Sequence, residues 1–306
     1  MRPSPTTPLP VAFPAPDGVT LRGSLHLPEG AAPHPAITMA HGYGAAGEHG
    51  LVPFAEAFTR AGFAVLIHDH RGFGSSDGTP RHDIDPWQQI EDRRRAVTFL
   101  RSRPEIDADR IGLWGTSYAG GHALVLGATD RRLKAVVAQV PIVSGPEQAR
   151  RRVAPENTSA LEAMLDDDEQ AQLHGEPPRT MALVSADPSV PAAYRTQDAI
   201  DFYLQALAEG TDWDNFVTVR STRKSRMYEP GAFIDRISPT PLLMVVAQND
   251  TTTLADTELA AYNRALEPKQ LVLVPGGHFD PYVRQFTRAS EAATEFFRTH
   301  LASTGD

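Results

Sequence analysis

The stretch that decides the fold is Arg110–Gly121, which reads RIGLWGTSYAGG. An apolar run ends there abruptly in small residues, with Ser117 at the centre of the change. A strand that turns sharply into a helix brings its backbone against neighbouring segments, so only small residues fit beside the turn. Gly115 and Ala119 lie two positions to either side of the serine. We therefore expect Ser117 to take an unusual backbone conformation that lifts its hydroxyl clear of a sheet.

Short apolar runs alternate with helical patterns on both sides of this stretch. Because these runs are almost continuously apolar, they are typical of parallel strands that helices cover on both faces. Two further short strands, over residues 11–15 and 21–28, precede them. The apolar runs are PAITMA (35–40), FAVLIH (63–68), RIGLWG (110–115), LKAVVAQV (133–140), PLLMVVA (241–247) and QLVLV (270–274).

The alternation stops near Gly145 and resumes at about residue 238. We therefore expect one α/β core built from residues 1–145 and 238–306, interrupted by an inserted helical cap over residues 146–237. Aromatic residues of the insertion, among them Trp213 and Tyr228, have two interpretations. They line a substrate pocket, or they pack inside the cap.

Three residues at the ends of predicted strands form a catalytic constellation. Ligands of a parallel sheet bind beyond the carboxyl ends of its strands, and Ser117, Asp250 and His278 each follow such an end. A serine hydroxyl needs a general base, and the base needs an acid that orients it. We assign these roles to His278 and Asp250. Asp250 also suits the N-cap of a following helix, but its place between the other two favours the triad.

The motif G-T-S-Y-A at residues 115–119 resembles the nucleophile elbow of the α/β-hydrolase superfamily, with alanine in place of the usual second glycine. The order serine, acid, histidine is also that of the superfamily. The resemblance implies an α/β-hydrolase fold over nearly the whole chain. It also implies an oxyanion hole made by the backbone N–H of Tyr118 and by Tyr43, which follows a His-Gly pair. Either the backbone N–H or the hydroxyl of Tyr43 serves as that second donor.

Within the superfamily, GLWGTSYAGGHAL and SPTPLLMVVAQND resemble the polyketide thiohydrolase/transferase group, near the dienelactone-hydrolase-like branch. This resemblance implies a hydrolase that cleaves a carboxylic ester or thioester through an acyl-enzyme on Ser117. One alternative is an acyltransferase that passes the acyl group to an alcohol or amine in specialised metabolism. A second alternative is a non-catalytic binding protein on the same fold. The sequence leaves open the acyl group, the leaving group and the oligomeric state.

Composition excludes several other classes of protein. The chain has 306 residues, a net charge of -9 and no cysteine, which argues against nucleic-acid binding, anionic membranes, thiolate metal sites and a cysteine nucleophile. No apolar run approaches the length of a membrane span, and we expect a cytoplasmic protein without a cofactor. His68 and His70 have the spacing of a metal pair, but no carboxylate cluster accompanies them. We expect Asp69 and His41 to stabilise their loops.

Overall fold

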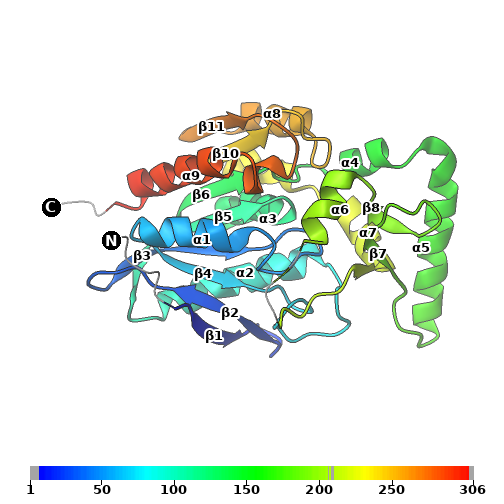
Figure 1. The fold of residues 1–306 in the computed structure, drawn as a ribbon, viewed down its shortest axis with the longest axis horizontal. Coiled ribbons are helices and arrows are strands. Elements are labelled where there is room, and N and C mark those ends of the chain that lie inside the picture. The colour runs from blue at the N-terminus through cyan, green and yellow to red at the C-terminus, as the bar shows by residue number, and fades with distance from the viewer. Residues whose placement is uncertain (1–6, 206, 208–209, 303–306) are drawn as a thin grey trace.

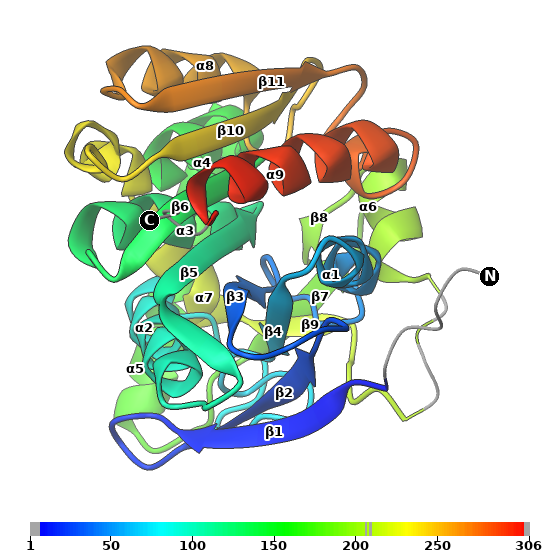
Figure 2. The ribbon, with the colours of Figure 1, turned by 90° about the vertical axis from the view of Figure 1, so that its left-hand side faces the viewer.

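The computed structural model describes residues 7–205, 207 and 210–302. Its centre is an eight-stranded sheet with the order β1-β2-β4-β3-β5-β6-β10-β11 (Figures 1 and 2). The strands are β1 (Leu9–Pro14), β2 (Thr20–His26), β3 (His34–Ala40), β4 (Ala64–His68), β5 (Ile106–Thr116), β6 (Leu133–Gln139), β10 (Leu242–Ala247) and β11 (Lys269–Val274).

The sheet is parallel apart from its first two strands. β1 pairs antiparallel with β2, and β2 pairs antiparallel with β4. The pairs from β4 through β3, β5, β6 and β10 to β11 are all parallel. This arrangement confirms the sheet expected from the apolar runs, and it places the carboxyl ends of six neighbouring strands at one edge.

Helices cover both faces, as Figure 2 shows. Helices α1 and α9 pack on one face, while α2, α3 and α8 pack on the other. The alternation of side chains along β10 supplies both cores: Leu242, Met244 and Val246 join one cluster, and Leu243 and Val245 join the other. The helices are α1 (Leu51–Arg60), α2 (Pro86–Arg101), α3 (Tyr118–Thr129), α8 (Ala255–Arg264) and α9 (Phe286–His300).

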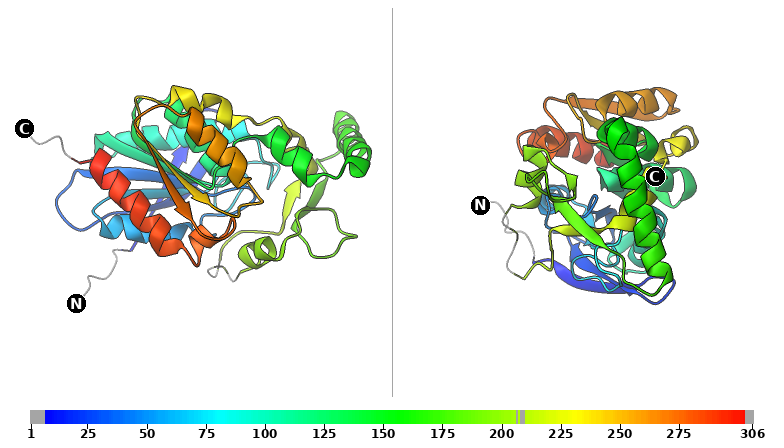
Figure 3. Two further views of the ribbon diagram at one scale, coloured as in Figure 1. Left: turned by 90° about the horizontal axis from the view of Figure 1, so that it is seen from above. Right: turned by 90° about the vertical axis from the view of Figure 1, so that its right-hand side faces the viewer.

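The chain leaves the sheet after β6 and returns to it at β10, which pairs directly with β6. We call residues 145–237 the intervening segment. It lies beyond one end of the large sheet (Figures 1 and 3). Its elements are α4 (Gly145–Arg152), η1 (Pro155–Asn157), α5 (Thr158–Leu173), β7 (Thr180–Val184), β8 (Ala192–Tyr194), α6 (Gln197–Tyr203), β9 (Phe216–Thr218), α7 (Val219–Arg226) and η2 (Pro230–Arg236).

The intervening segment contains a small sheet as well as helices, in the order β8-β7-β9. The sequence led us to expect helices alone. Strands of three to five residues are too short for an alternating apolar pattern to become visible. In the described part of the chain, no helix is both long and apolar enough to cross a membrane.

Candidate active site

Ser117 lies at the turn between β5 and α3, with φ 56° and ψ -120°. Non-glycine residues rarely adopt such a positive φ, so the strained conformation expected from the sequence is confirmed. Gly115 permits the turn, because a Cβ there would lie 2.2 Å from the carbonyl oxygen of Ala119. The Ser117 N–H donates to the carbonyl of Gln139 at 2.9 Å, and its carbonyl accepts from the N–H of Ile142 at 3.0 Å. The chain at the end of β6 therefore holds the turn in place.

The structure brings the three predicted triad residues together at the carboxyl edge of the sheet. His278 Nε2 lies 2.9 Å from Ser117 Oγ, and His278 Nδ1 lies 2.7 Å from Asp250 Oδ2. All three side chains are buried. When the Nδ1–H donates to the carboxylate, Nε2 has a free lone pair that accepts the proton of the serine hydroxyl.

Asp250 is held by more than the histidine. Its Oδ1 accepts hydrogen bonds from the backbone N–H groups of Thr252 at 2.7 Å and Thr253 at 2.9 Å. Burial raises the pKa of the Asp250 carboxyl, but the neighbouring His278 and the hydrogen bonds from His278 and Thr253 outweigh burial and keep the pKa below its usual value. Asp250 is thus an ionised acid within a turn, and helix α8 begins only at Ala255.

The loop after β3 passes directly beside the nucleophile. A Cβ on Gly42 would lie 3.2 Å from the Cβ of Ser117, and Tyr43 is the next residue. Tyr118 is the first residue of α3, so its backbone N–H has no acceptor within the helix. The N–H groups at the start of a helix favour negative charge. These two backbone segments therefore flank the position where an oxyanion would form.

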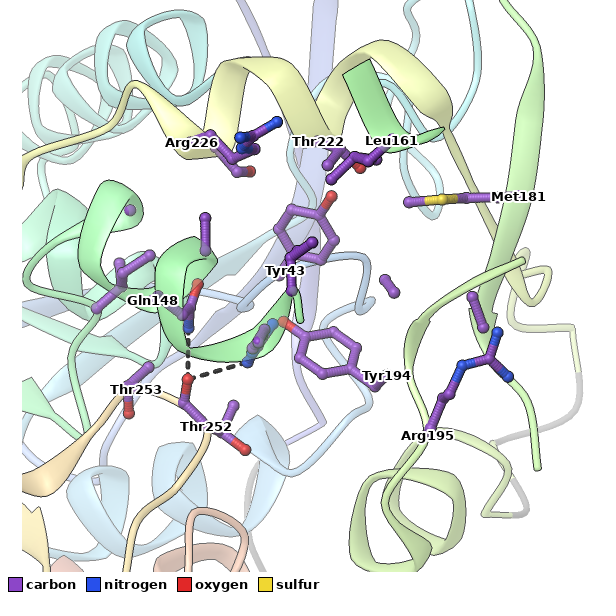
Figure 4. Close-up of a pocket in the computed structure, with 18 of the residues that line it drawn as sticks. Tyr43, Gln148, Leu161, Met181, Tyr194, Arg195, Thr222, Arg226, Thr252 and Thr253 are labelled. Atoms are coloured by element: carbon purple, nitrogen blue, oxygen red, sulfur yellow. Dashed lines mark hydrogen bonds between the residues drawn. The ribbon is translucent and has the colours of Figure 1, made fainter. Parts of the chain in front are cut away.

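The side chain of Tyr43 is directed away from this position, into the intervening segment. Its hydroxyl interacts with those of Ser225 and Thr222, and Figure 4 shows the ring pointing toward Thr222. Burial raises the pKa of the Tyr43 hydroxyl well above its ordinary value. Because the hydroxyl is engaged there, the geometry favours the backbone N–H of Tyr43 as the oxyanion donor.

The histidines near this loop stabilise its backbone. His41 Nδ1 lies 3.0 Å from the carbonyl of Gly42, and His41 Nε2 accepts from the backbone N–H of His70 at 3.2 Å. Asp69 accepts from the N–H groups of Gly47 and Ser75, each at 3.0 Å. The structural roles expected for His41 and Asp69 are confirmed. Among the residues described, no group of three or more histidine, aspartate or glutamate side chains is placed to hold a metal ion.

A cavity of about 690 Å³ opens in front of Ser117. The catalytic edge forms its base, and the intervening segment forms most of its wall (Figure 4). The apolar part of the wall comes largely from α5, β7 and the loop after β6. The charged side chains on the wall are all arginines, and the described lining residues include no aspartate or glutamate. The apolar lining includes Ile142, Val153, Leu161, Met164 and Met181, and the arginines are Arg152, Arg195 and Arg226.

The three arginines differ in their partners. Arg226 forms an ion pair with a glutamate of α5 at 2.5 Å, and Arg195 donates to two carbonyls of its own loop. The Arg152 guanidinium lies 4.6 Å from the ring centroid of Tyr194 and donates to the carbonyl of Thr252 at 2.9 Å. Neither Arg152 nor Arg195 forms an ion pair with a carboxylate of the described chain, so both guanidinium groups bring an uncompensated positive charge to the wall.

Trp213 and Tyr228, which we had considered as pocket residues, are not among the residues that line the cavity. Tyr228 is fully buried, and its hydroxyl lies 2.8 Å from Nδ1 of His122. Trp213 donates from Nε1 to the carbonyl of Gly44 at 2.7 Å. Both rings therefore serve packing and positioning. Arg152 and Tyr194 were missed, because they lie in irregular sequence where no periodic pattern marks a wall.

The sheet order and the structural neighbours show that this protein has the α/β-hydrolase fold and is an α/β-hydrolase enzyme. The family model described as X-Pro dipeptidyl-peptidase (S15 family) matches residues 17–280, and the chain belongs to this family.

Three curated relatives align over most of the chain. Quorum-quenching protein AidA of Acinetobacter baumannii is 33% identical over 96% of this chain and 95% of its own length. Polyketide transferase grgF of a Penicillium species is 30% identical over 95% of this chain and 96% of its own length. Thiohydrolase aneE of Aspergillus aculeatus is 31% identical over 85% of this chain and 83% of its own length. The chain is therefore similar along most of its length to proteins named as a quorum-quenching protein, a polyketide transferase and a thiohydrolase.

Two solved structures show the same fold. The crystal structure of GrgF from Penicillium sp. sh18 has a TM-score of 0.82 and 29% identity, covering 97% of this chain and 100% of that one. The structure of DcsB in complex with its substrate analogue has a TM-score of 0.85 and 29% identity, with the same coverage of both chains. The similarity to polyketide transferase grgF therefore extends from sequence to structure.

Proposed function

We propose that this protein is a serine hydrolase that cleaves a carboxylic ester or thioester through an acyl-enzyme on Ser117. The continuous contact from Ser117 Oγ through His278 to Asp250 carries this proposal, because those distances suit proton transfer from the hydroxyl to Nε2. The nucleophile also lies at the base of a cavity large enough for an acyl chain.

The reaction has two halves. Ser117 Oγ attacks the acyl carbon while His278 Nε2 takes the hydroxyl proton, and Asp250 stabilises the imidazolium. The backbone N–H groups of Tyr43 and Tyr118 stabilise the negative oxygen of the tetrahedral intermediate. The bond to the leaving group then breaks, and the leaving alcohol or thiol receives the proton from Nε2. Water repeats the sequence on the acyl-enzyme, which releases a carboxylic acid and restores Ser117.

The intervening segment acts in this proposal as a cap over residues 146–237 that selects the acyl group. Apolar side chains of α5 and β7 face the cavity, and each substrate methylene buried there contributes up to about 0.8 kcal/mol. A peptide amino terminus is a poor match for this wall, because a cationic amine needs a carboxylate and the charged lining residues are arginines. The lining thus favours a neutral or anionic acyl compound over a peptide with a cationic amino terminus, which argues against a dipeptide-releasing reaction.

Acyl transfer is the second candidate. It uses the same acyl-enzyme but replaces water with an alcohol or amine, and relatives named polyketide transferases support it. The difference between the two reactions lies in which nucleophile reaches the acyl carbon second, and the same triad serves both.

A fluorophosphonate probe tests the proposal without knowledge of the substrate. We expect one probe molecule per chain on Ser117 and no labelling of Ser117→Ala. A panel of p-nitrophenyl esters and matched thioesters, graded in acyl length, then identifies the class of substrate. Product analysis with and without added alcohol separates hydrolysis from transfer. An unlabelled wild-type protein would indicate a non-catalytic binding protein on this fold.

A further inference from the structure

Two side chains continue the triad on the side away from the nucleophile. Thr253 Oγ1 lies 2.9 Å from Asp250 Oδ2 and 2.7 Å from Glu258 Oε1. It also lies 3.1 Å from Nδ1 of His278. Glu258 belongs to α8 and its side chain has no solvent exposure. A chain of contacts thus runs from a fully buried carboxyl, through one hydroxyl, to the acid of the triad.

This chain of contacts has too few protons if both of its carboxyl groups are ionised. A threonine hydroxyl has a single proton to donate, yet Thr253 Oγ1 lies within hydrogen-bond distance of two carboxyl groups. The proton on Nδ1 of His278 already points to Asp250. If both carboxyl groups were ionised, one of the two short contacts would bring a lone pair of the Thr253 hydroxyl oxygen against a lone pair of a carboxylate oxygen, with no proton between them. Both contacts are hydrogen bonds only when one carboxyl carries a proton.

The surroundings decide which carboxyl carries it. Asp250 accepts two backbone hydrogen bonds on Oδ1 and faces the imidazole on Oδ2, which are the contacts of an ionised group. Glu258 has no cationic partner, and its Oε2 has no hydrogen-bond partner among the described residues. Burial raises the pKa of the Glu258 carboxyl well above its ordinary value, and the charge of Asp250 raises it further.

The other titratable groups around Glu258 do not change this assignment. Asp256 on the same helix adds a negative charge, although Arg151 of α4 pairs with it at 2.7 Å. Tyr282, from the short helix η3 (Asp280–Tyr282), interacts electrostatically with Glu258 and stays protonated because burial raises its pKa. His278 is the remaining group that faces this cluster from another element. None of these residues supplies a permanent positive charge to Glu258.

We propose that Glu258 is a positioning residue that stays protonated and donates its proton to Thr253 Oγ1, so that the Thr253 hydroxyl donates to Asp250. The neutral acid thereby fixes the direction of one hydroxyl and gives the triad carboxylate a further donor. An ionised Glu258 would instead take the proton of Thr253 and place a second negative charge behind the imidazole. The catalytic part of this inference rests on the proposed function, whereas the protonation state can be measured independently of it.

Thermal unfolding of Glu258→Gln tests the protonation state. A glutamate that is neutral in the native state but ionised in the unfolded chain makes the protein progressively less stable as pH rises above 4.5. Glutamine has the same shape and a donor N–H but no such dependence. We expect the melting temperature of E258Q to exceed that of the wild type by a margin that widens from pH 5 to pH 8. Glu295→Gln, at an exposed position on α9, is the control for the general effect of replacing a glutamate by glutamine on the melting temperature. A constant margin would overturn the proposal.

Labelling kinetics test the positioning role. We expect E258Q to keep the acid limb that the wild type shows in its pH profile of fluorophosphonate labelling, because a neutral donor replaces a neutral donor. Thr253→Val removes the hydroxyl and should slow labelling about tenfold, the usual scale for one hydrogen bond to a charged group. Thr253→Ser should restore the rate.

Thr257→Val is the matched control, because the Thr257 hydroxyl bonds only to backbone carbonyls of its own turn in the described structure. It should label at the wild-type rate. If E258Q shifts the acid limb to lower pH and slows labelling strongly, Glu258 is an anion and the proposal is wrong. If the wild type itself is not labelled, the proposed function fails instead, while the unfolding experiment still decides the protonation of Glu258.

Discussion

The carboxyl edge of the large sheet and the intervening segment are built in different ways. At the edge, parallel strands that pair along their backbones end together and carry Ser117, Asp250 and His278 into contact. The segment has short strands and helices, and it is attached to the core by side-chain contacts and by isolated backbone hydrogen bonds, such as the one from the N–H of Thr218 to the carbonyl of His82 at 3.1 Å. Tyr203 donates to the carbonyl of Tyr43 at 2.8 Å in one such side-chain contact. The comparison teaches that backbone pairing brings the catalytic residues together, whereas selection of the acyl group by the segment is part of the proposed function.

The two regions nevertheless meet beside the catalytic residues. Tyr203 and Trp213 of the segment bind the carbonyls of Tyr43 and Gly44, on the loop that flanks the nucleophile. The segment therefore contacts the catalytic edge at the backbone of the loop that carries Tyr43, as well as at the carbonyl of Thr252, which accepts from Arg152.

The largest effect is expected at the edge itself. Ser117→Ala should lower turnover about 10⁶-fold, as removal of the nucleophile does in comparable triads, while leaving the fold intact. His278→Ala should cost about as much, and the double variant little more, because the residues act as one unit. Ester turnover and circular dichroism check both points. Multiplicative losses in the double variant would contradict the assignment.

Asp250→Asn should lower turnover about 10⁴-fold. The amide has the size of the carboxylate but stabilises neither the imidazolium nor the tautomer with a proton on Nδ1. Single-turnover kinetics on the best ester of the panel measure the loss. A loss of tenfold or less would indicate that another acid orients His278.

Acidification should destabilise the core before it affects the segment. Burial lowers the pKa of His41, His70 and His122, and it lowers that of His68 to about 3. A base whose native pKa lies below its unfolded value of 6.5 contributes stability above that pH and loses it as pH falls. His68 should therefore remove about 1.4 kcal/mol per pH unit between pH 6.5 and its native pKa of about 3, and the other three histidines should act in the same direction.

Urea unfolding at pH 7 and pH 5.5 measures this loss. His68→Leu should reduce the pH dependence, because it removes the imidazole whose pKa burial lowers to about 3. A variant as pH-sensitive as the wild type would show that His68 is protonated in the native state.

The same contrast explains what the sequence could predict. The order of apolar runs indicated the parallel sheet, and strand ends in a parallel sheet converge, so Ser117, Asp250 and His278 could be grouped without coordinates. The wall could not be predicted in this way. Arg152 ends a short helix and Tyr194 ends a three-residue strand. Long-range contacts, which no periodicity records, bring them to the cavity.

Trp213→Phe tests the contact between the regions. It keeps an aromatic ring but removes the donor to the carbonyl of Gly44. We expect turnover to fall about tenfold, and the free energy of unfolding to fall by about 1 kcal/mol, the usual net value of one hydrogen bond. The ranking of acyl lengths should not change, because the ring does not line the cavity. A changed ranking would indicate that Trp213 does contact the acyl group in the cavity.

The smallest effect concerns Arg152, and it tests selection alone. Its guanidinium lies on the cavity wall without an ion-pair partner in the described chain, so an acyl group with a terminal carboxylate should gain a charged contact there. Because the site is partly exposed, that gain is about 1 kcal/mol. We expect Arg152→Gln to lower kcat/KM for a carboxylate-bearing p-nitrophenyl ester about fivefold while leaving its methyl-terminated counterpart unchanged. Arg150→Gln is the matched control, since Arg150 lies on the same helix, pairs with Glu147 and does not line the cavity. Equal losses for both esters would mean that Arg152 only supports the carbonyl of Thr252 and the ring of Tyr194. In that case the wall would distinguish acyl groups by length and shape rather than by charge.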